Sequence, residues 1–256
     1  MSKFRNKIYD IYADLVFNLN KKSSKKIIKD KSTLPEGFTV TYHSGALNTK
    51  PNTVKSIDTA ISHGAKIVEI DVSFRPDGTP VIIHDSAPEI NQGVLLENAL
   101  KAVAQSKTCM INLDIKSTAN LGAVDELVMQ YGLTERVFYT GVFDDWVEKV
   151  KSSSSIPYYL NHSITNQEAT DISFAQAVAD KAKKLGAIGI NSNYNPATEL
   201  FVETMRKNGL LVSLWTVNNM QDMVKVIRLK PDNITTKKPH YLKRILAEYR
   251  EYNFNE

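Results

Sequence analysis

The amino-acid sequence predicts an α/β fold, a (β/α)8 or TIM barrel, and three observations lead to this prediction. Short apolar segments with strand character alternate with helical segments from residue 38 onward. Glycines stand where helices should end before the next strand, at Gly64, Gly132, Gly186 and Gly209. The chain has 256 residues, close to the usual length of such a barrel. We therefore expect residues 37–256 to form one domain, preceded by an extension over residues 1–36.

Eight strand–helix units account for the alternation. The expected strands span residues 38–42, 65–72, 109–115, 136–140, 157–160, 187–190, 210–215 and 233–234. The expected helices span residues 53–62, 95–105, 123–131, 144–151, 174–185, 197–207, 220–229 and 241–252. A further short strand at 79–84 follows the second strand through the Asp77-Gly78 turn, a dipeptide typical of hairpins. The predicted barrel thus carries a short hairpin after its second strand.

The extension over residues 1–36 has a different character. Apolar residues recur at helical spacing from Ile8 to Leu19, which predicts an extra N-terminal helix. A polar segment follows, with six clustered lysines: Lys21, Lys22, Lys25, Lys26, Lys29 and Lys31. One interpretation is a helix that caps a barrel end, followed by a solvated linker. The other is a basic amphipathic helix that lies on an anionic membrane surface.

Composition and charge exclude several classes of protein. The sequence is 42% hydrophobic and 23% charged, as in ordinary globular proteins, and a net charge of +4 is too small to indicate a nucleic-acid partner. No apolar run approaches the roughly 18 residues of a membrane span. The single cysteine, Cys109, excludes an internal disulfide. We expect a cytoplasmic location, with peripheral membrane contact through residues 1–36 as the alternative.

The candidate site follows from the barrel itself, because active sites of such barrels lie at the carboxyl ends of the strands. The first strand ends at His43, the hairpin ends at His84, and the seventh strand ends at Trp215. A histidine near neutral pH can give or take a proton in hydrolysis. Two histidines at neighbouring strand ends therefore suggest an acid–base pair, although the sequence does not say which one is the acid.

Acidic residues occupy the same predicted edge. Glu69 and Asp71 stand two apart on the second strand, so both side chains point to one face. Asp114 adds a third carboxylate from the next strand of the barrel. Three carboxylates this close would repel one another, and they suit a hard divalent cation such as Mg²⁺ or Ca²⁺. Lys116 shares the face of Asp114, where it can bind a phosphate oxygen or form a salt bridge with a carboxylate.

These residues resemble the glycerophosphodiester phosphodiesterase family over about residues 38 to 240. The motifs, in order, are His43-Ser44-Gly45, Asn52-Thr53, Glu69-Ile70-Asp71-Val72, Asp77 to Asp85, Asn112 to Lys116, Leu214 to Asn218 and Ile234 to Pro239. The resemblance implies a phosphodiesterase barrel with a Mg²⁺ or Ca²⁺ ion. It implies that His43 and His84 are the acid–base pair, and that Glu69, Asp71 and Asp114 hold the metal. Lys116 and Trp215 would then bind the substrate.

Two departures from the family pattern bear on the substrate. The family usually has an arginine after its first histidine, whereas this chain has Ser44, a neutral residue that we also expect to contact the phosphate. Only about 24 residues separate His84 from Cys109, which predicts an open site and leaves the head group undecided. A small phosphodiester or a lysophospholipid would suit such a site. His162 and Asn191, which also follow strands, are further candidates for substrate contact.

The expected reaction is hydrolysis of a glycerophosphodiester or related phosphodiester to an alcohol and a phosphomonoester. The alternatives are a lysophospholipase D-like activity on lipid phosphodiesters, which would place the chain in lipid metabolism, and a phosphate-binding barrel without catalysis. The sequence does not indicate the oligomeric state.

Overall fold

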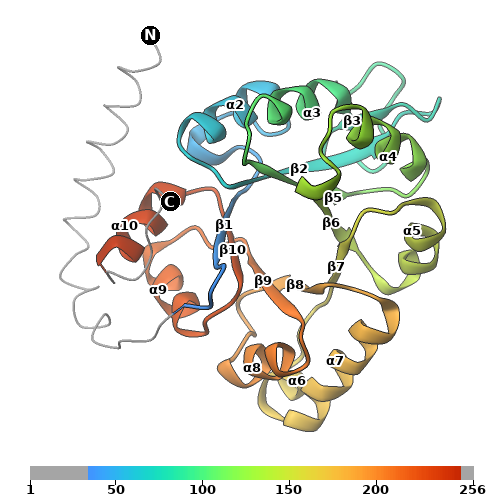
Figure 1. The fold of residues 1–256 in the computed structure, drawn as a ribbon. Helices are drawn as coiled ribbons and strands as arrows, with labels where there is room; N and C mark the ends of the chain where they lie inside the picture. Colours follow the sequence, from blue (N-terminus) through green and yellow to red (C-terminus); the bar gives the residue numbers. More distant parts are fainter. Residues whose placement is uncertain (1–33, 249–256) are drawn as a thin grey trace.

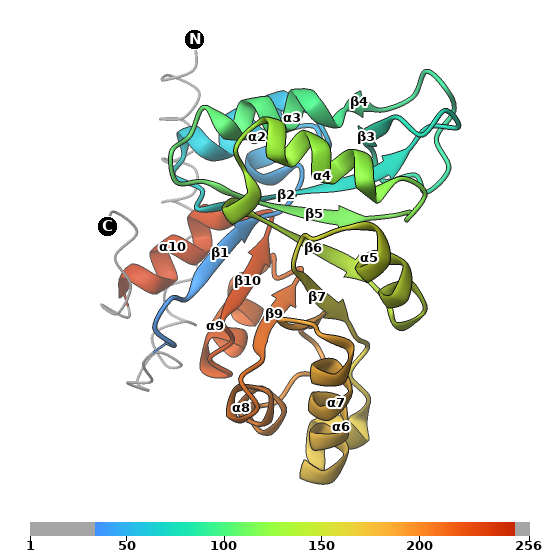
Figure 2. The same ribbon diagram turned by 45° about the vertical axis from the view of Figure 1, so that its right-hand side comes forward.

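A computed structural model describes residues 34–248 as a closed barrel with helices around it (Figures 1 and 2). Eight parallel strands follow one another around the described barrel in the order β1, β10, β9, β8, β7, β6, β5 and β2, and the pairing of β1 with β2 closes it. Their bounds are β1 Thr39–Tyr42, β2 Ile67–Phe74, β5 Met110–Ile115, β6 Val137–Val142, β7 Tyr158–Asn161, β8 Gly189–Asn193, β9 Leu211–Trp215 and β10 Asn233–Thr236. The predicted TIM barrel is confirmed.

Helices follow the strands and cover the outside of the barrel (Figure 2). Their bounds are α2 Val54–Ser62, α3 Leu96–Ala104, α4 Leu121–Gln130, α5 Val147–Ser153, α6 Asn166–Thr170, α7 Ile172–Leu185, α8 Glu199–Lys207, α9 Met220–Arg228 and α10 Pro239–Glu248. Short 3-10 turns lie at Ala46–Asn48, Thr134–Arg136 and Asp144–Trp146. Polar residues start several helices: Thr53 accepts a hydrogen bond from Ser56 N, and Asn219 accepts one from Asp222 N.

The hairpin after β2 is confirmed and extends the sheet by two strands. β3 (Pro80–Ile82) pairs antiparallel with the end of β2, and β4 (Val94–Leu95) pairs antiparallel with β3. The Asp77-Gly78 turn connects β2 to β3, and Gly78 has a φ of 82°, a backbone conformation that glycine adopts without strain. This hairpin brings the following residues, including His84, back toward the carboxyl end of the barrel.

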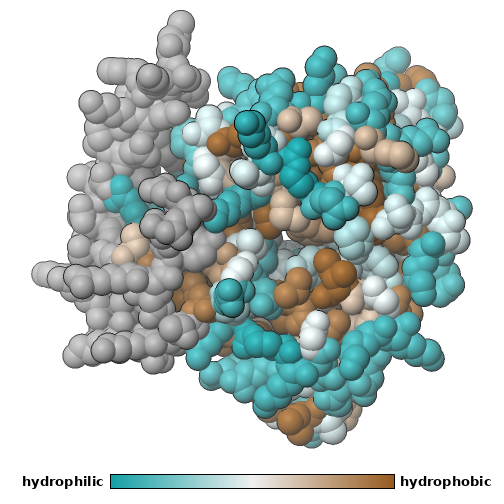
Figure 3. All heavy atoms as spheres, viewed as in Figure 1, coloured by the Kyte–Doolittle hydropathy of each residue, from teal (hydrophilic) through white to brown (hydrophobic). Residues whose placement is uncertain are grey.

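Two layers fill the inside of the barrel below the strand ends. At the amino ends of β2, β6 and β7, the buried side chains of Ile67, Phe138 and Tyr159 pack together, and the two rings are 5.4 Å apart between centroids. Next to them lies a polar group in which Asn233 Nδ2 donates to Thr41 Oγ1 over 2.9 Å. On the face drawn in Figure 3, hydrophilic side chains dominate the outer helices and hydrophobic ones gather toward the centre. The barrel is therefore filled at one end and shapes a site at the other.

Most predicted boundaries are within a few residues of those observed. The largest differences follow the fifth parallel strand, β7, where the single predicted helix at 174–185 is preceded by the short helix α6, and α7 begins at Ile172. Thr165 starts α6 with a capping box, in which Thr165 and Glu168 each satisfy the other's backbone N–H. The predicted N-terminal helix and lysine-rich segment lie outside the described residues. No helix among residues 34–248 is long and apolar enough to cross a membrane.

Candidate active site

A cavity of about 840 Å³ lies at the carboxyl ends of the strands. Such a volume falls in the range of small-molecule sites. Predicted site residues that line it are His43, Glu69, Asp71, His84, Asp114, Lys116 and Trp215. The two further candidates, His162 and Asn191, line it as well. The barrel thus brings together residues that are up to 172 positions apart in the sequence, from His43 to Trp215.

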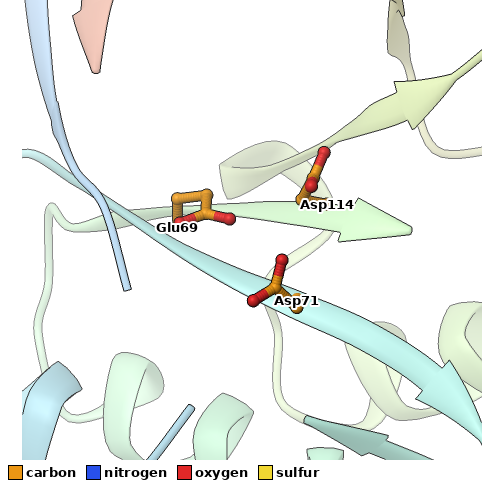
Figure 4. A group of neighbouring side chains, drawn as sticks. All are labelled: Glu69, Asp71 and Asp114. Carbon is orange, nitrogen blue, oxygen red and sulfur yellow. The ribbon is translucent and has the colours of Figure 1, made fainter. Parts of the chain in front are cut away.

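The three acidic residues form one cluster, because two neighbouring strands present them in register. Asp71 on β2 is directly opposite Asp114 on β5, and Glu69 lies two residues earlier on the same face of β2. One oxygen of each carboxylate lies within 4.8 Å of the others. Figure 4 shows the three carboxyl groups around one space between these strands. Glu69 and Asp71 are buried, and Asp114 is partly exposed to the cavity.

Lys116 neutralises part of this negative charge. Its Nζ is 2.9 Å from Asp71 Oδ1 and also forms an ion pair with Asp114. Burial alone would lower the pKa of Lys116, but Asp114 and Asp71 outweigh it and hold the pKa above its usual value. The salt bridge that the sequence allowed is therefore present, and it involves two carboxylates. The lysine is committed to the acidic cluster.

Asn52 and Ser44 form hydrogen bonds that orient the carboxylates of the cluster. Asn52 Nδ2 donates to Asp71 Oδ2 over 2.7 Å, and Asn52 Oδ1 accepts from Asp71 N over 3.1 Å. Ser44 N donates to Glu69 Oε2 over 2.8 Å, while the Ser44 hydroxyl donates to Asn52 Oδ1 over 2.9 Å. Ser44 is only 2% exposed and is not among the residues that line the cavity. Its place in the structure is that of a residue that orients two of the carboxylates.

His43 lies beside Glu69 at the end of β1. Its Nδ1 is 3.0 Å from the Ser44 carbonyl oxygen and 3.4 Å from Glu69 Oε2. Burial lowers the pKa of His43 below its usual value; the Ser44 carbonyl raises it and the charge of Lys237 lowers it further. A neutral imidazole that donates from Nδ1 to the carbonyl has Nε2 free to accept a proton.

The donor set fits a hard divalent cation. Burial, followed by the neighbouring Asp71 and Asp114, raises the pKa of Glu69 well above its usual value. Three carboxylates face one ammonium group, so the ionised cluster carries more negative charge than Lys116 balances. A divalent cation would relieve that repulsion, and carboxylate oxygens are the ligands that Mg²⁺ and Ca²⁺ prefer. Among residues 34–248, Glu69, Asp71 and Asp114 can hold such an ion.

Comparison with known proteins matches this barrel and its strand-end residues to one family. The model of the glycerophosphoryl diester phosphodiesterase family matches residues 43–94 and 91–240. The chain belongs to this family. The chain is therefore a phosphoric diester hydrolase.

Individual relatives agree with the family match. A glycerophosphodiester phosphodiesterase from Caldanaerobacter subterraneus is 23% identical over 238 residues, which cover 79% of this chain and 95% of that protein. A phosphodiesterase from Oleispira antarctica, solved with its product sn-glycerol-3-phosphate, is 19% identical with a TM-score of 0.68, over 84% of this chain and 97% of that chain. A glycerophosphodiester phosphodiesterase from Parabacteroides distasonis is 20% identical with a TM-score of 0.70, over 86% and 100%. These two structures share the fold.

The second predicted histidine occupies the mouth of the cavity of this phosphodiesterase family member. His84 follows the hairpin strand β3, and Ile83 N donates to Asp71 O over 3.1 Å, which holds the segment against β2. The His84 side chain is exposed. The two histidines thus differ in setting: His43 is at the buried end of the cluster and His84 is at the solvent side.

Several residues of the site carried no predicted role. Asn52 stands in a loop with a φ of 52°, and its contact with Asp71 depends on a turn that the sequence pattern did not reveal. Lys237 follows β10 and lines the cavity. Across the cavity, Asn161 Oδ1 accepts hydrogen bonds from Gly141 N and Asn191 Nδ2, each over 2.9 Å. The signal that could have indicated a role is a position near the end of a strand, where Asn161 and Lys237 both stand.

Proposed function

We propose that this phosphodiesterase hydrolyses a glycerophosphodiester or a related small phosphodiester to an alcohol and a phosphomonoester, in a reaction that depends on a divalent cation and on two histidines. The observation that carries the proposal is the meeting of three carboxylates, one within 3.4 Å of His43, at the closed end of one cavity. The relative from Oleispira antarctica was solved with sn-glycerol-3-phosphate as its product, which supports this class of substrate.

Glu69, Asp71 and Asp114 would hold Mg²⁺ or Ca²⁺ at this position. When bound, the cation supplies charge neutralisation and polarises a phosphoryl oxygen. The protein side chains keep the ligands in place: Ser44 orients Glu69, and Asn52 orients Asp71. We assign Ser44 to this positioning role, in place of the phosphate contact expected from the sequence, because its hydroxyl and its N–H are both engaged.

His43 and His84 would perform the proton transfers. One histidine takes a proton from the nucleophile, which is water or an adjacent hydroxyl of the substrate. Attack by the hydroxyl would give a cyclic phosphodiester, which water then opens to the phosphomonoester. The other donates a proton to the oxygen of the leaving alcohol, so that it departs as a neutral alcohol. Both side chains line the cavity, and His84 at the solvent side is near the opening through which an alcohol can leave.

The direct test is hydrolysis of glycerophosphocholine, glycerophosphoethanolamine and bis-(p-nitrophenyl) phosphate by the purified full chain, with and without Mg²⁺ or Ca²⁺. We expect turnover that a chelator abolishes and that added metal restores. His43→Ala and His84→Ala should each lower kcat by about 10²- to 10⁴-fold. His63→Ala is the matched control, because His63 lies at the end of α2 outside the cavity-lining residues. Metal-loaded, folded protein that turns over no diester would contradict the proposal.

A lysophospholipase D-like activity is the second candidate, and one observation favours it. Phe143 is 48% exposed and lines the cavity together with Trp146, with the rings in edge contact at 6.3 Å between centroids. An aromatic pair with one exposed ring at the edge of a polar site offers apolar surface to an acyl chain. Hydrolysis of lysophosphatidylcholine vesicles with no activity on glycerophosphocholine would decide for this candidate.

A further inference from the structure

The phosphate group of a diester needs a cation that the protein has not already paired. Among the residues that line the cavity, only two carry a permanently cationic side chain, Lys116 and Lys237, and none is an arginine. Lys116 is held by Asp71 and Asp114. Lys237 forms no ion pair with any described carboxylate within 4.0 Å. The cavity therefore has one uncommitted ammonium group.

The strand register places Lys237 beside His43. Parallel strands β1 and β10 pair Thr39 with Asn233 and Thr41 with Thr235. Asn233 Nδ2 contacts the hydroxyls of both threonines, so these alternate positions point into the barrel. The next position in the same register on each strand is His43 on one side and Lys237 on the other, and both line the cavity.

The backbone around Lys237 is fixed on both sides. His43 N donates to Thr236 O over 3.0 Å, and Leu47 N donates to Lys237 O over 3.2 Å. Lys237 N donates to Asn218 Oδ1 over 2.8 Å. These bonds involve main-chain atoms of Lys237, so that its side chain is left for the cavity. The neighbouring Lys238 differs, because its Nζ donates to Asn48 Oδ1 over 2.9 Å and it does not line the cavity.

Charge balance requires such a group. Three carboxylates and Lys116 carry two net negative charges, which one divalent cation would cancel. A bound phosphodiester then adds one negative charge in a partly buried site, which a nearby cation stabilises. Ser44 has no charge, and its N–H and hydroxyl are directed to Glu69 and Asn52.

We propose that Lys237 binds the phosphate of the substrate. The strand register places its side chain at the cavity, and its ammonium group is not paired with a described carboxylate. The inference rests on the proposed function, because it concerns the same phosphodiester site. Lys237 contacts a non-bridging phosphate oxygen from the end of β10, which is separated by β1 from the strand that carries Glu69 and Asp71.

Inorganic phosphate is the probe, and its affinity for the Mg²⁺-loaded full chain is measured by calorimetry. We expect Lys237→Met to weaken phosphate binding by about 10- to 100-fold, the usual worth of a hydrogen bond to a charged group. Lys237→Arg should stay within a few-fold of wild type. Lys238→Met, which keeps every cavity residue, should bind phosphate as wild type does. With a diester substrate, Lys237→Met should raise KM or lower kcat/KM by a factor similar to the loss of phosphate affinity.

Two results would overturn the assignment: a Lys237→Met protein that binds phosphate as tightly as wild type, or a wild-type protein with no measurable phosphate binding. Equal losses in Lys237→Met and Lys238→Met would overturn it too, since the effect would then be general to the basic loop. Thermal unfolding of each variant identifies proteins that fail to fold, and Lys237→Gln replaces the methionine variant if that protein does not fold. If phosphate binding depends on Lys237 while no diester is hydrolysed, the assignment stands and the proposed function fails.

Discussion

The two sides of the cavity differ in charge, although one continuous barrel forms both. The side built from β10, β1, β2 and β5 carries the charged residues Lys237, His43, Glu69, Asp71, Asp114 and Lys116. The side built from β6 to β9 presents neutral residues, apart from His162: Thr140, Phe143, Trp146, Asn161, Asn191 and Trp215. His162 itself is 3.0 Å from Glu168, a residue of α6. For the proposed reaction, we therefore expect the phosphate of the diester on the charged side and the alcohol on the neutral side.

Loss of one carboxylate from the charged side should have the largest effect on metal binding and on hydrolysis. Asp71→Asn keeps the shape of the side chain but removes a charge that contacts Lys116 and Asn52. Partners in the outer shell of a metal are worth about 10- to 100-fold in affinity, so a direct ligand should cost at least about 100-fold. We expect calorimetry to show this loss for Mg²⁺ and Ca²⁺, with diester hydrolysis falling at least as far. Asp125→Asn is the control, because Asp125 lies on α4 and does not line the cavity. Equal metal affinity in both variants would show that the acidic cluster is not the metal site.

The two histidines on the charged side can be separated by the leaving group. Nitrophenolate departs without protonation, whereas an alkyl alcohol needs an acid. We expect alanine variants of His43 and His84 to lose about 10²- to 10⁴-fold in kcat on glycerophosphocholine. On bis-(p-nitrophenyl) phosphate, the variant that lacks the acid should recover most of that loss, and the other should not. If both variants lose the same factor on both substrates, the division of acid and base between them is wrong.

Changes on the neutral side should depend on the substrate. Phe143→Ala removes an aromatic ring from the cavity wall, and covering a ring of that size is worth about 1.5 to 3 kcal/mol. We expect kcat/KM for a lysophospholipid to fall by about tenfold, with little change for glycerophosphocholine. Phe174→Ala is a matched control, because Phe174 is 44% exposed at the start of α7 and does not line the cavity. A uniform loss on all diesters would place Phe143 with the phosphate rather than the alcohol.

A change outside both sides should affect stability but leave catalysis unchanged. Burial, with Lys238 and His63 nearby, lowers the pKa of His240 from 6.5 to about 4. As the pH falls, the unfolded chain binds this proton before the folded chain does. The contribution of His240 to the free energy of unfolding is therefore complete above pH 6.5 and is lost as the pH drops toward 4. The ring is only partly buried, so we expect a loss of about 1 to 2 kcal/mol.

Urea unfolding at pH 7 and pH 4.5 measures this loss, and His240→Gln should show less of it than wild type. His63→Gln serves as the comparison. An identical pH dependence in the wild type and in His240→Gln would show that other groups cause the acid destabilisation.

Regular alternation is the reason that so much of the charged side could be predicted from the sequence. Residues two apart on a strand share a face, which placed Glu69 with Asp71 and Asp114 with Lys116 before any contact was known. The adjacency of β2 and β5 followed from the barrel, once the hairpin between them was recognised. The pattern could not indicate which polar side chains form hydrogen bonds or ion pairs with one another. The sequence allowed Lys116 either to bind a phosphate oxygen or to pair with a carboxylate, and only the three-dimensional structure shows it between two aspartates.

Loop residues were harder to predict for a related reason. Asn52 reaches Asp71 from a turn with positive φ, and Ser44 is turned away from the cavity by a hydrogen bond to Asn52. Neither orientation has a periodic signal. Family resemblance placed Ser44 at a phosphate-binding position, but a substituted side chain does not keep the direction of the one it replaces. The directions of side chains on strands could therefore be predicted from the sequence, whereas those in the loops after the strands could not.

The hydrophobic layer of Ile67, Phe138 and Tyr159 has a consequence for the order in which the products leave. This layer lies at the amino ends of β2, β6 and β7, whereas the cavity lies at the carboxyl ends of the strands. For the proposed reaction, we therefore expect both products to leave at the carboxyl ends of the strands, where the diester enters. The alcohol carries no phosphate for the charged side to hold, so we expect it to depart first. We expect the charged side to hold the phosphomonoester longer, so that added phosphomonoester should slow the turnover of the proposed reaction.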